Sequence, residues 1–135
     1  GLPAAPPPTT DEVVTRVAHT QLPSAGYEVF GLDDFEQLSA GLAQVHPSRY
    51  RALVAGIDVC CIRGVQTLSD QATALRWVVL ADRLYDRDIP VVYSGVPLDH
   101  LFAPELLVGG YRKKYRRAIS RLVSLSRDGE RLLHG

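Results

Sequence analysis

Methionine is absent from this 135-residue chain, and cysteine is limited to the adjacent Cys60 and Cys61. The missing methionine indicates that Gly1 is a processing boundary and that the sequence is part of a longer protein. Neighbouring residues of a strand point to opposite faces, so the two cysteines are expected to be buried hydrophobic residues rather than a disulfide or a C-x-x-C pair. This pattern favours a reducing compartment.

Long apolar runs are also absent: none approaches the ~20 residues that a membrane-spanning helix needs. The first residues carry prolines in place of the charged and apolar regions of a signal peptide. These absences predict a cytoplasmic protein. The length suits a single domain, and a hydrophobic share of 46% is ordinary for a globular protein.

Sequence motifs for the common catalytic chemistries are missing as well. The chain has no G-x-x-x-x-G-K-[ST] loop for a triphosphate, no G-x-G-x-x-G after a strand and no G-x-S-x-G elbow. Its four histidines are far apart and show no metal-ligand spacing. We therefore expect no catalytic residue and no metal site in this chain.

The chain does have a strongly asymmetric charge distribution. Residues 111–127 contain seven basic residues and no acidic one, although the formal net charge of the whole chain is zero. This segment predicts a basic helix whose partner is anionic. Arg117 and Arg121, four residues apart on one helical face, could clamp a phosphate together, or could instead pair with acids such as Asp82 or Asp86. Tyr111 and Tyr115 lie among the basic residues as nucleic-acid stacking groups do, and the pattern alone favours neither ligand.

Hydrophobic patterning predicts an α/β fold with a small, mostly parallel sheet flanked by helices. Strands are expected near residues 13–18, 27–30, 57–62 and 89–93, and the first two could pair as a hairpin. The run 57–62 is apolar on both faces, which is typical of a central strand. A helix that opens at Ser69-Asp70 separates it from the run 89–93, so these two strands form a parallel βαβ unit.

Two pairs of neighbouring polar residues could have a structural or a chemical role. Asp33 or Asp34 is expected to cap a helix that reaches about Gln44. Asp99 and His100 follow the last strand, where open α/β sheets bind ligands, and could form an acid-base pair. They are sequence neighbours without a third member, so a loop and helix start is the favoured interpretation.

Three segments resemble the ZapE family, the AFG-one-like P-loop ATPases of the AAA+ class. Residues 76–86 are similar to the family run Arg-Phe-Ile-x-Leu-Ile-Asp-x-Leu-Tyr-Asp. Residues 94–102 resemble Ser-Ala-x-x-Pro-Leu-x-x-Leu-Phe with one residue fewer, and residues 115–122 resemble Phe-x-Arg-Thr-x-Ser-Arg-Leu. The three motifs occur in the family's order.

The prolines of residues 1–10 predict an extended linker. The resemblance implies that residues 11–135 are the C-terminal domain of a larger ATPase. ATP and Mg²⁺ would be bound by the N-terminal P-loop part of the same protein, and this chain alone would be inactive. Arg117 and Arg121 would be nucleotide-sensing candidates. The family further implies a role in cell division, with the FtsZ ring and neighbouring subunits as partners and peripheral association with the inner face of the membrane. The alternatives are a protein-interaction module without a nucleotide role, or anion or nucleic-acid binding through the basic helix 111–127. Of these partners, nucleic acid is the less expected one.

Overall fold

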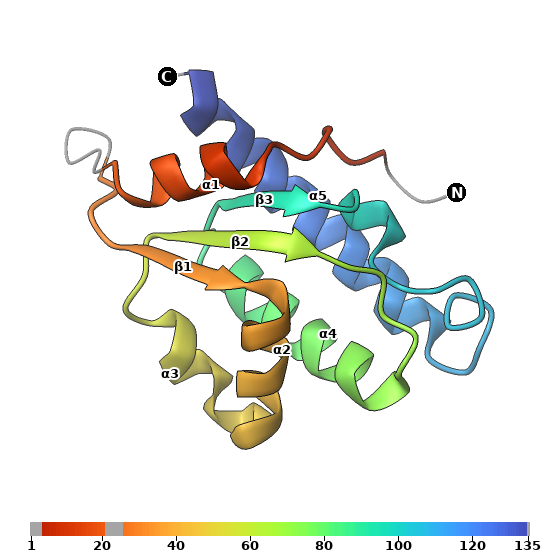
Figure 1. Cartoon of the computed structure of the whole chain (residues 1–135). Coiled ribbons are helices and arrows are strands. Elements are labelled where there is room, and N and C mark those ends of the chain that lie inside the picture. Colours follow the sequence, from red (N-terminus) through yellow and green to blue (C-terminus); the bar gives the residue numbers. More distant parts are fainter. Residues whose placement is uncertain (1–3, 21–25, 135) are drawn as a thin grey trace.

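The computed structural model describes residues 4–20 and 26–134 as a three-stranded sheet surrounded by helices (Figure 1). The long basic helix at the C-terminal side of the sequence is present and extends further than the predicted basic segment. In chain order the elements are α1 (Asp11–Ala18), β1 (Phe30–Asp34), α2 (Phe35–Gln44), η2 (Pro47–Arg49), α3 (Tyr50–Val54), β2 (Val59–Val65), α4 (Gln71–Asp86), β3 (Val91–Gly95), η3 (Leu98–His100) and α5 (Arg112–His134).

The sheet has the order β1-β2-β3, and both pairings are parallel. Phe30 lies opposite Val59, and Cys60 lies opposite Val91. β2 is the central strand of this order, and its first four residues are buried because helices cover both faces of the sheet. The predicted α/β class and the parallel βαβ unit formed by β2, α4 and β3 are confirmed.

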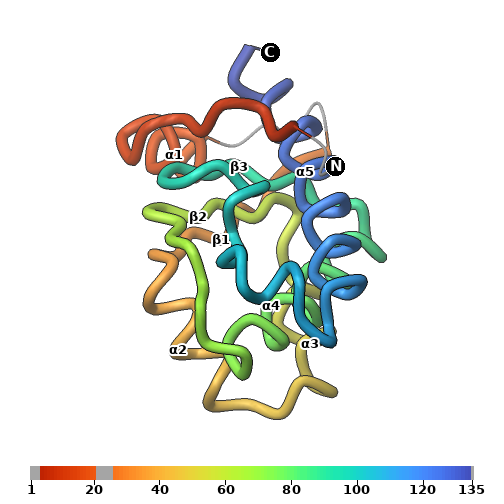
Figure 2. Tube along the Cα trace, turned by 90° about the vertical axis from the view of Figure 1, so that its right-hand side faces the viewer, coloured from red at the N-terminus to blue at the C-terminus, as the bar shows by residue number. Residues whose placement is uncertain are grey.

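Helices cover both faces of the sheet (Figures 1 and 2). α1 lies on one face, α2 and α4 lie on the other, and α5 runs beside β3 while packing on α4. The larger core includes Trp77, Tyr50 and Cys60, whereas Cys61 belongs to the smaller core under α1. The two cysteines therefore occupy opposite faces of β2, as predicted.

The predicted strand at 13–18 is wrong, because these residues belong to helix α1. Thr10 caps the helix by accepting a hydrogen bond from the Val13 amide, and two acidic residues follow in the first turn. The valines in this segment suggested a strand, yet Val14 is buried in the smaller core with Val17 and Ala18 packed around it. That spacing of three and four residues is helical.

The predicted hairpin is also wrong, since the strand expected at 27–30 begins only at Phe30 and pairs in parallel with β2. Residues 21–25, which would include the turn of that hairpin, lie outside the described residues. The predicted cap of α2 needs a further correction: Asp34 occupies the N-cap position but makes no side-chain capping bond. Its carboxylate accepts a hydrogen bond from Arg63 Nε at 2.8 Å instead.

The segment before α1 packs on the domain. Thr9 forms a parallel bridge with Ser94, and its amide donates to the Tyr93 carbonyl at 3.1 Å. Tyr93 Oη in turn donates to the Pro6 carbonyl at 3.2 Å. These contacts place residues of the proline-rich segment along the outer edge of β3.

Asp70 caps α4, as the sequence predicts. Its carboxylate accepts hydrogen bonds from the Thr73 amide at 2.9 Å and from the Thr73 hydroxyl at 2.7 Å. Both bonds lower the pKa of Asp70, and the bond from the Thr73 hydroxyl contributes most. Within the described part of the chain, no helix has both the length and the apolarity to cross a bilayer.

Replacing Tyr50 by Phe is expected to lower the free energy of unfolding by about 1–2 kcal/mol. The Tyr50 side chain is fully buried, and its hydroxyl donates to the Leu42 carbonyl at 2.6 Å, joining α3 to the end of α2. The variant leaves that carbonyl without this partner. Urea unfolding of both proteins measures the difference, and equal midpoints with equal slopes would contradict the assigned role of the hydroxyl.

Burial raises the pKa of the Cys61 thiol to about 12, and burial is also the main cause of the raised pKa of Cys60. Both thiols stay protonated in the folded protein at pH 9–10, whereas the unfolded thiols ionise near pH 8.5. Stability is therefore expected to fall as the pH rises above that value, by about 1.4 kcal/mol per pH unit for each thiol. The free energy of unfolding is measured by urea at pH 7 and at pH 10, for the wild type and for the double variant Cys60→Ala/Cys61→Ala. The variant should lose less stability between the two pH values, because it lacks both thiols.

Candidate functional site

The two arginines singled out from the sequence lie on α5 and face Asp82 of α4. Arg121 Nη1 donates to Asp82 Oδ1 at 2.5 Å, and Arg117 Nη2 lies 3.7 Å from Asp82 Oδ2. Asp82 is 17% exposed, so this carboxylate is largely removed from solvent. The structure thus brings Arg117 and Arg121 together around one acid.

The two guanidinium groups differ in how firmly they are held. The Arg121 side chain is 29% exposed, and its guanidinium carbon lies 4.9 Å from the centre of the Tyr85 ring, a cation–π contact. The Arg117 side chain is 54% exposed, and its one ion pair with a residue that the structure describes is the longer contact with Asp82. Asp82 and Tyr85 therefore fix Arg121, while Arg117 can turn toward an anion in solution without leaving Asp82 unpaired.

Of the two acids considered as pairing partners, only Asp82 fills that role. Asp86 instead lies 3.2 Å from Arg83 Nη2, one turn earlier on α4. The spacing of residues 82–86 on the helix explains this division, because Asp82 and Tyr85 share the face toward α5.

Asp99 and His100 lie in η3, which confirms the loop and helix start. The distance from His100 Nε2 to Asp99 Oδ2 is 3.9 Å, too long for a hydrogen bond, and His100 is 70% exposed. Asp99 Oδ1 is buried without a hydrogen-bond partner among the described residues. This geometry does not bring the two side chains together as an acid-base pair.

Sequence reasoning missed a polar network at the carboxyl ends of the three strands. Arg63, near the end of β2, donates through Nε to Asp34 of β1 and through Nη1 to Thr15 Oγ1 of α1 at 2.9 Å. Ser94, at the end of β3, is buried; its hydroxyl accepts from the Gly64 amide at 3.0 Å and donates to Asp11 Oδ1. The network joins every strand end to α1.

Arg63 is the only charged residue in β2, and this feature of the sequence could have indicated the network. A charge near the end of a buried strand needs a partner. Which acid supplies it depends on the strand register, and Asp34 is the residue opposite Arg63 in the pairing of β1 with β2. That register is not readable from the sequence.

Neither the sequence motifs nor the side chains described by the structure supply the usual elements of an ATP–Mg²⁺ site. The sequence has no phosphate-binding loop, and α4 begins at an acidic cap, Asp70, which would repel a phosphate at that helix end. Over residues 4–20 and 26–134, no group of three or more His, Cys, Asp or Glu side chains is arranged to hold a metal ion. At the strand ends, Asp34 is already paired with Arg63, and Asp11 accepts from Ser94.

A comparison with protein-family models shows the relationship of the whole chain. The model of the AFG1-like ATPase family matches residues 3–131, which is nearly the full length. No curated protein and no solved structure matches the chain. The match includes α4, most of α5, and both Arg117 and Arg121. Because it covers nearly the whole chain, we conclude that the chain belongs to the AFG1-like ATPase family.

Proposed function

We propose that this chain is the C-terminal module of a ZapE-like AAA+ ATPase, in which ATP and Mg²⁺ bind to a P-loop part outside these 135 residues. Membership of the AFG1-like ATPase family supports a parent that hydrolyses ATP. The absence of a phosphate-binding loop from the sequence supports an accessory role for this module. In this proposal residues 11–135 form the domain and residues 1–10 lead into it.

Arg117 is the residue that meets the nucleotide in this proposal. The observation that carries it is the α4–α5 pairing: Arg121 is held at 2.5 Å by Asp82, whereas Arg117 lies 3.7 Å away with 54% of its side chain exposed. An exposed guanidinium on a well-packed helix can turn toward a phosphate that a neighbouring part of the assembly presents and stabilise its charge. Arg121 is a positioning residue, since it satisfies Asp82 when Arg117 turns outward.

The test is ATP turnover by the full-length gene product, with and without the substitution Arg117→Ala. We expect turnover by the intact protein, none by residues 1–135 alone, and a large loss in the variant. Turnover by the isolated chain would overturn the accessory role. A wild-type rate for the Arg117→Ala protein would overturn the role of the arginine but not the family assignment.

The cellular setting belongs to the same proposal. The ZapE-like parent acts in the cytoplasm in cell division, at the FtsZ ring and at the inner face of the membrane, with neighbouring subunits as further partners. Affinity capture with purified FtsZ, followed by sedimentation with anionic vesicles, tests both contacts. Failure of both would restrict the proposal to the ATPase role.

A protein-interaction module without a nucleotide role is the second candidate. The short Arg121–Asp82 bond favours it, because a carboxylate that is 17% exposed neutralises part of the basic surface and anchors α5 to α4. The two candidates differ in one measurement. If the arginines serve only the α4–α5 contact, their variants lose stability while ATP turnover per folded molecule stays unchanged.

A further inference from the structure

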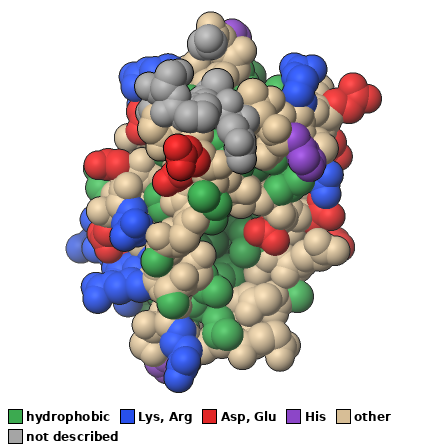
Figure 3. Space-filling view, turned by 90° about the vertical axis from the view of Figure 1, so that its left-hand side faces the viewer, with side chains coloured by type: hydrophobic (Ala, Val, Ile, Leu, Met, Phe, Trp, Pro, Cys, Tyr) green, Lys and Arg blue, Asp and Glu red, His purple; other side chains and the backbone are tan. Residues whose placement is uncertain are grey.

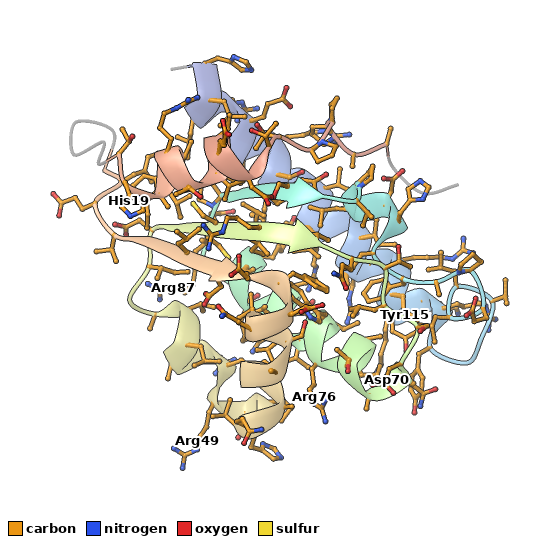
Figure 4. The ribbon with its side chains drawn as sticks, viewed as in Figure 1. His19, Arg49, Asp70, Arg76, Arg87 and Tyr115 are labelled. Atoms are coloured by element: carbon orange, nitrogen blue, oxygen red, sulfur yellow. The ribbon has the colours of Figure 1, made fainter. Side chains whose placement is uncertain are left out.

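A surface cleft lies between α3 and the end of α4, away from the α4–α5 pairing. Three arginines line it, with one acid and small apolar side chains between them. The lining residues are Arg51, Ala52, Val54, Ala55, Arg83, Asp86 and Arg87. Figure 4 shows the labelled Arg87 on the α3 side of the molecule, beside the chain that leads from α3 into the sheet. On the face drawn in Figure 3, Lys and Arg side chains gather along one flank of an apolar strip.

The cleft has more guanidinium groups than carboxylates within ion-pair distance. Backbone hydrogen bonds are the main cause of the lowered pKa of Asp58, and Arg87 adds to this effect, so Asp58 balances part of the charge of Arg87 from further away. Asp86 Oδ2 lies 3.2 Å from Arg83 Nη2 and accounts for one arginine. Arg87 donates only a long hydrogen bond, 3.4 Å, to the Ala55 carbonyl at the end of α3. Arg51 makes no hydrogen bond or ion pair with any residue that the structure describes. Two guanidinium groups therefore lack a carboxylate within ion-pair distance among the described residues.

Secondary structure holds the arginines in one place. Arg83 and Arg87 are one turn apart at the end of α4, so they share a face, and Arg51 lies in the first turn of the packed helix α3. Arg83 is 23% exposed, and its Nε atom is buried without a hydrogen-bond partner in the described part of the chain. The free carbonyls at the C-terminal end of α4 favour the nearby Arg83 and Arg87, which helps the fold to tolerate their positive charge.

We propose that this cleft binds the phosphate groups of a small soluble phosphorylated molecule. Guanidinium groups present paired N–H donors in a plane, which matches two oxygens of a phosphate. The apolar side chains of Ala52 and Val54 reduce the water around the site and so strengthen the charge interaction. Asp86, which is half exposed, competes with the ligand for Arg83. The site is independent of the proposed nucleotide role of Arg117.

Calorimetric titration of the purified chain with pyrophosphate, at low ionic strength, tests the site. We expect saturable binding that weakens about tenfold in Arg51→Gln, as expected for one charged hydrogen-bonded contact. The matched control is Arg49→Gln, which removes an exposed arginine two residues away that does not line the cleft. Asp86→Asn should bind more tightly, because it removes the competing carboxylate.

Titrations with inorganic phosphate and sulfate separate the ligand classes, and pyrophosphate should bind more tightly than either. Absence of binding overturns the proposal. Equal losses in Arg49→Gln and Arg51→Gln also overturn it, because they indicate a general charge effect rather than a site. Arg51→Gln should unfold at the wild-type temperature, since Arg51 has no side-chain partner among residues 4–20 and 26–134. Weakened binding in that variant would therefore not reflect unfolding.

Discussion

Gly129→Ala is expected to destabilise the protein by about 3 kcal/mol or more, or to prevent folding. Gly129 is buried in α5 where the helix crosses β3, and a Cβ atom placed there would lie 1.9 Å from the Val91 carbonyl oxygen and 2.6 Å from its carbon. Both atoms belong to the backbone of a core strand and cannot rotate away. The variant must therefore move α5 off the sheet, which opens the cores on both sides of it.

Gly41→Ala is the matched control for this prediction. Gly41 is also inside a helix, α2, but a Cβ atom there would meet nothing within 4 Å. Alanine favours the helix over glycine by about 1 kcal/mol, so this variant should be more stable than the wild type. Denaturant unfolding of the two variants should give shifts of opposite sign, and a wild-type midpoint for Gly129→Ala would contradict the α5–β3 packing.

Arg117→Ala in the full-length protein is expected to reduce ATP turnover by about 10³-fold, the order of magnitude known for arginine fingers. The same change should leave the free energy of unfolding nearly unchanged, because Arg117 is 54% exposed and its contact with Asp82 is 3.7 Å long. Arg121→Ala should instead cost about 2 kcal/mol of stability, since it removes a charged hydrogen bond from a carboxylate that is 17% exposed.

Arg116→Ala is the control for the charge of α5, since Arg116 is an exposed neighbour whose Nη2 donates to the Leu107 carbonyl rather than to Asp82. It should hydrolyse ATP at close to the wild-type rate. Equal losses for the Arg116 and Arg117 variants would indicate a dependence on overall basic charge. An Asp82→Asn protein separates positioning from structure. Turnover should fall because Arg117 and Arg121 both lose the carboxylate that holds them beside α4, and the KM for ATP should change less than kcat.

Much of the fold and a small part of the site could be predicted from the sequence. Particular residues show which features could be predicted and which could not. β2, α4 and β3 were placed within about two residues at most ends because each has a local pattern: a run apolar on both faces, an Asp70 cap with helical spacing, and a second apolar run. The α1 segment was misjudged because its valines have strand propensity, and burial of Val14 against the sheet outweighs that propensity. For the site, the sequence placed Arg117 and Arg121 on one helical face, but it left open which acid they meet.

The sequence alone determined β2, α4 and β3, because their hydrophobic pattern and the residues that begin and end them lie within a few consecutive positions. It also determined that the chain has no phosphate-binding loop. Only the tertiary structure decided that Asp82 holds Arg121, that Arg63 pairs with Asp34, and that Arg51 faces the end of α4 across a cleft. These contacts join residues 29 to 39 positions apart. Strand register and helix packing, which are properties of the assembled core, set which of them form.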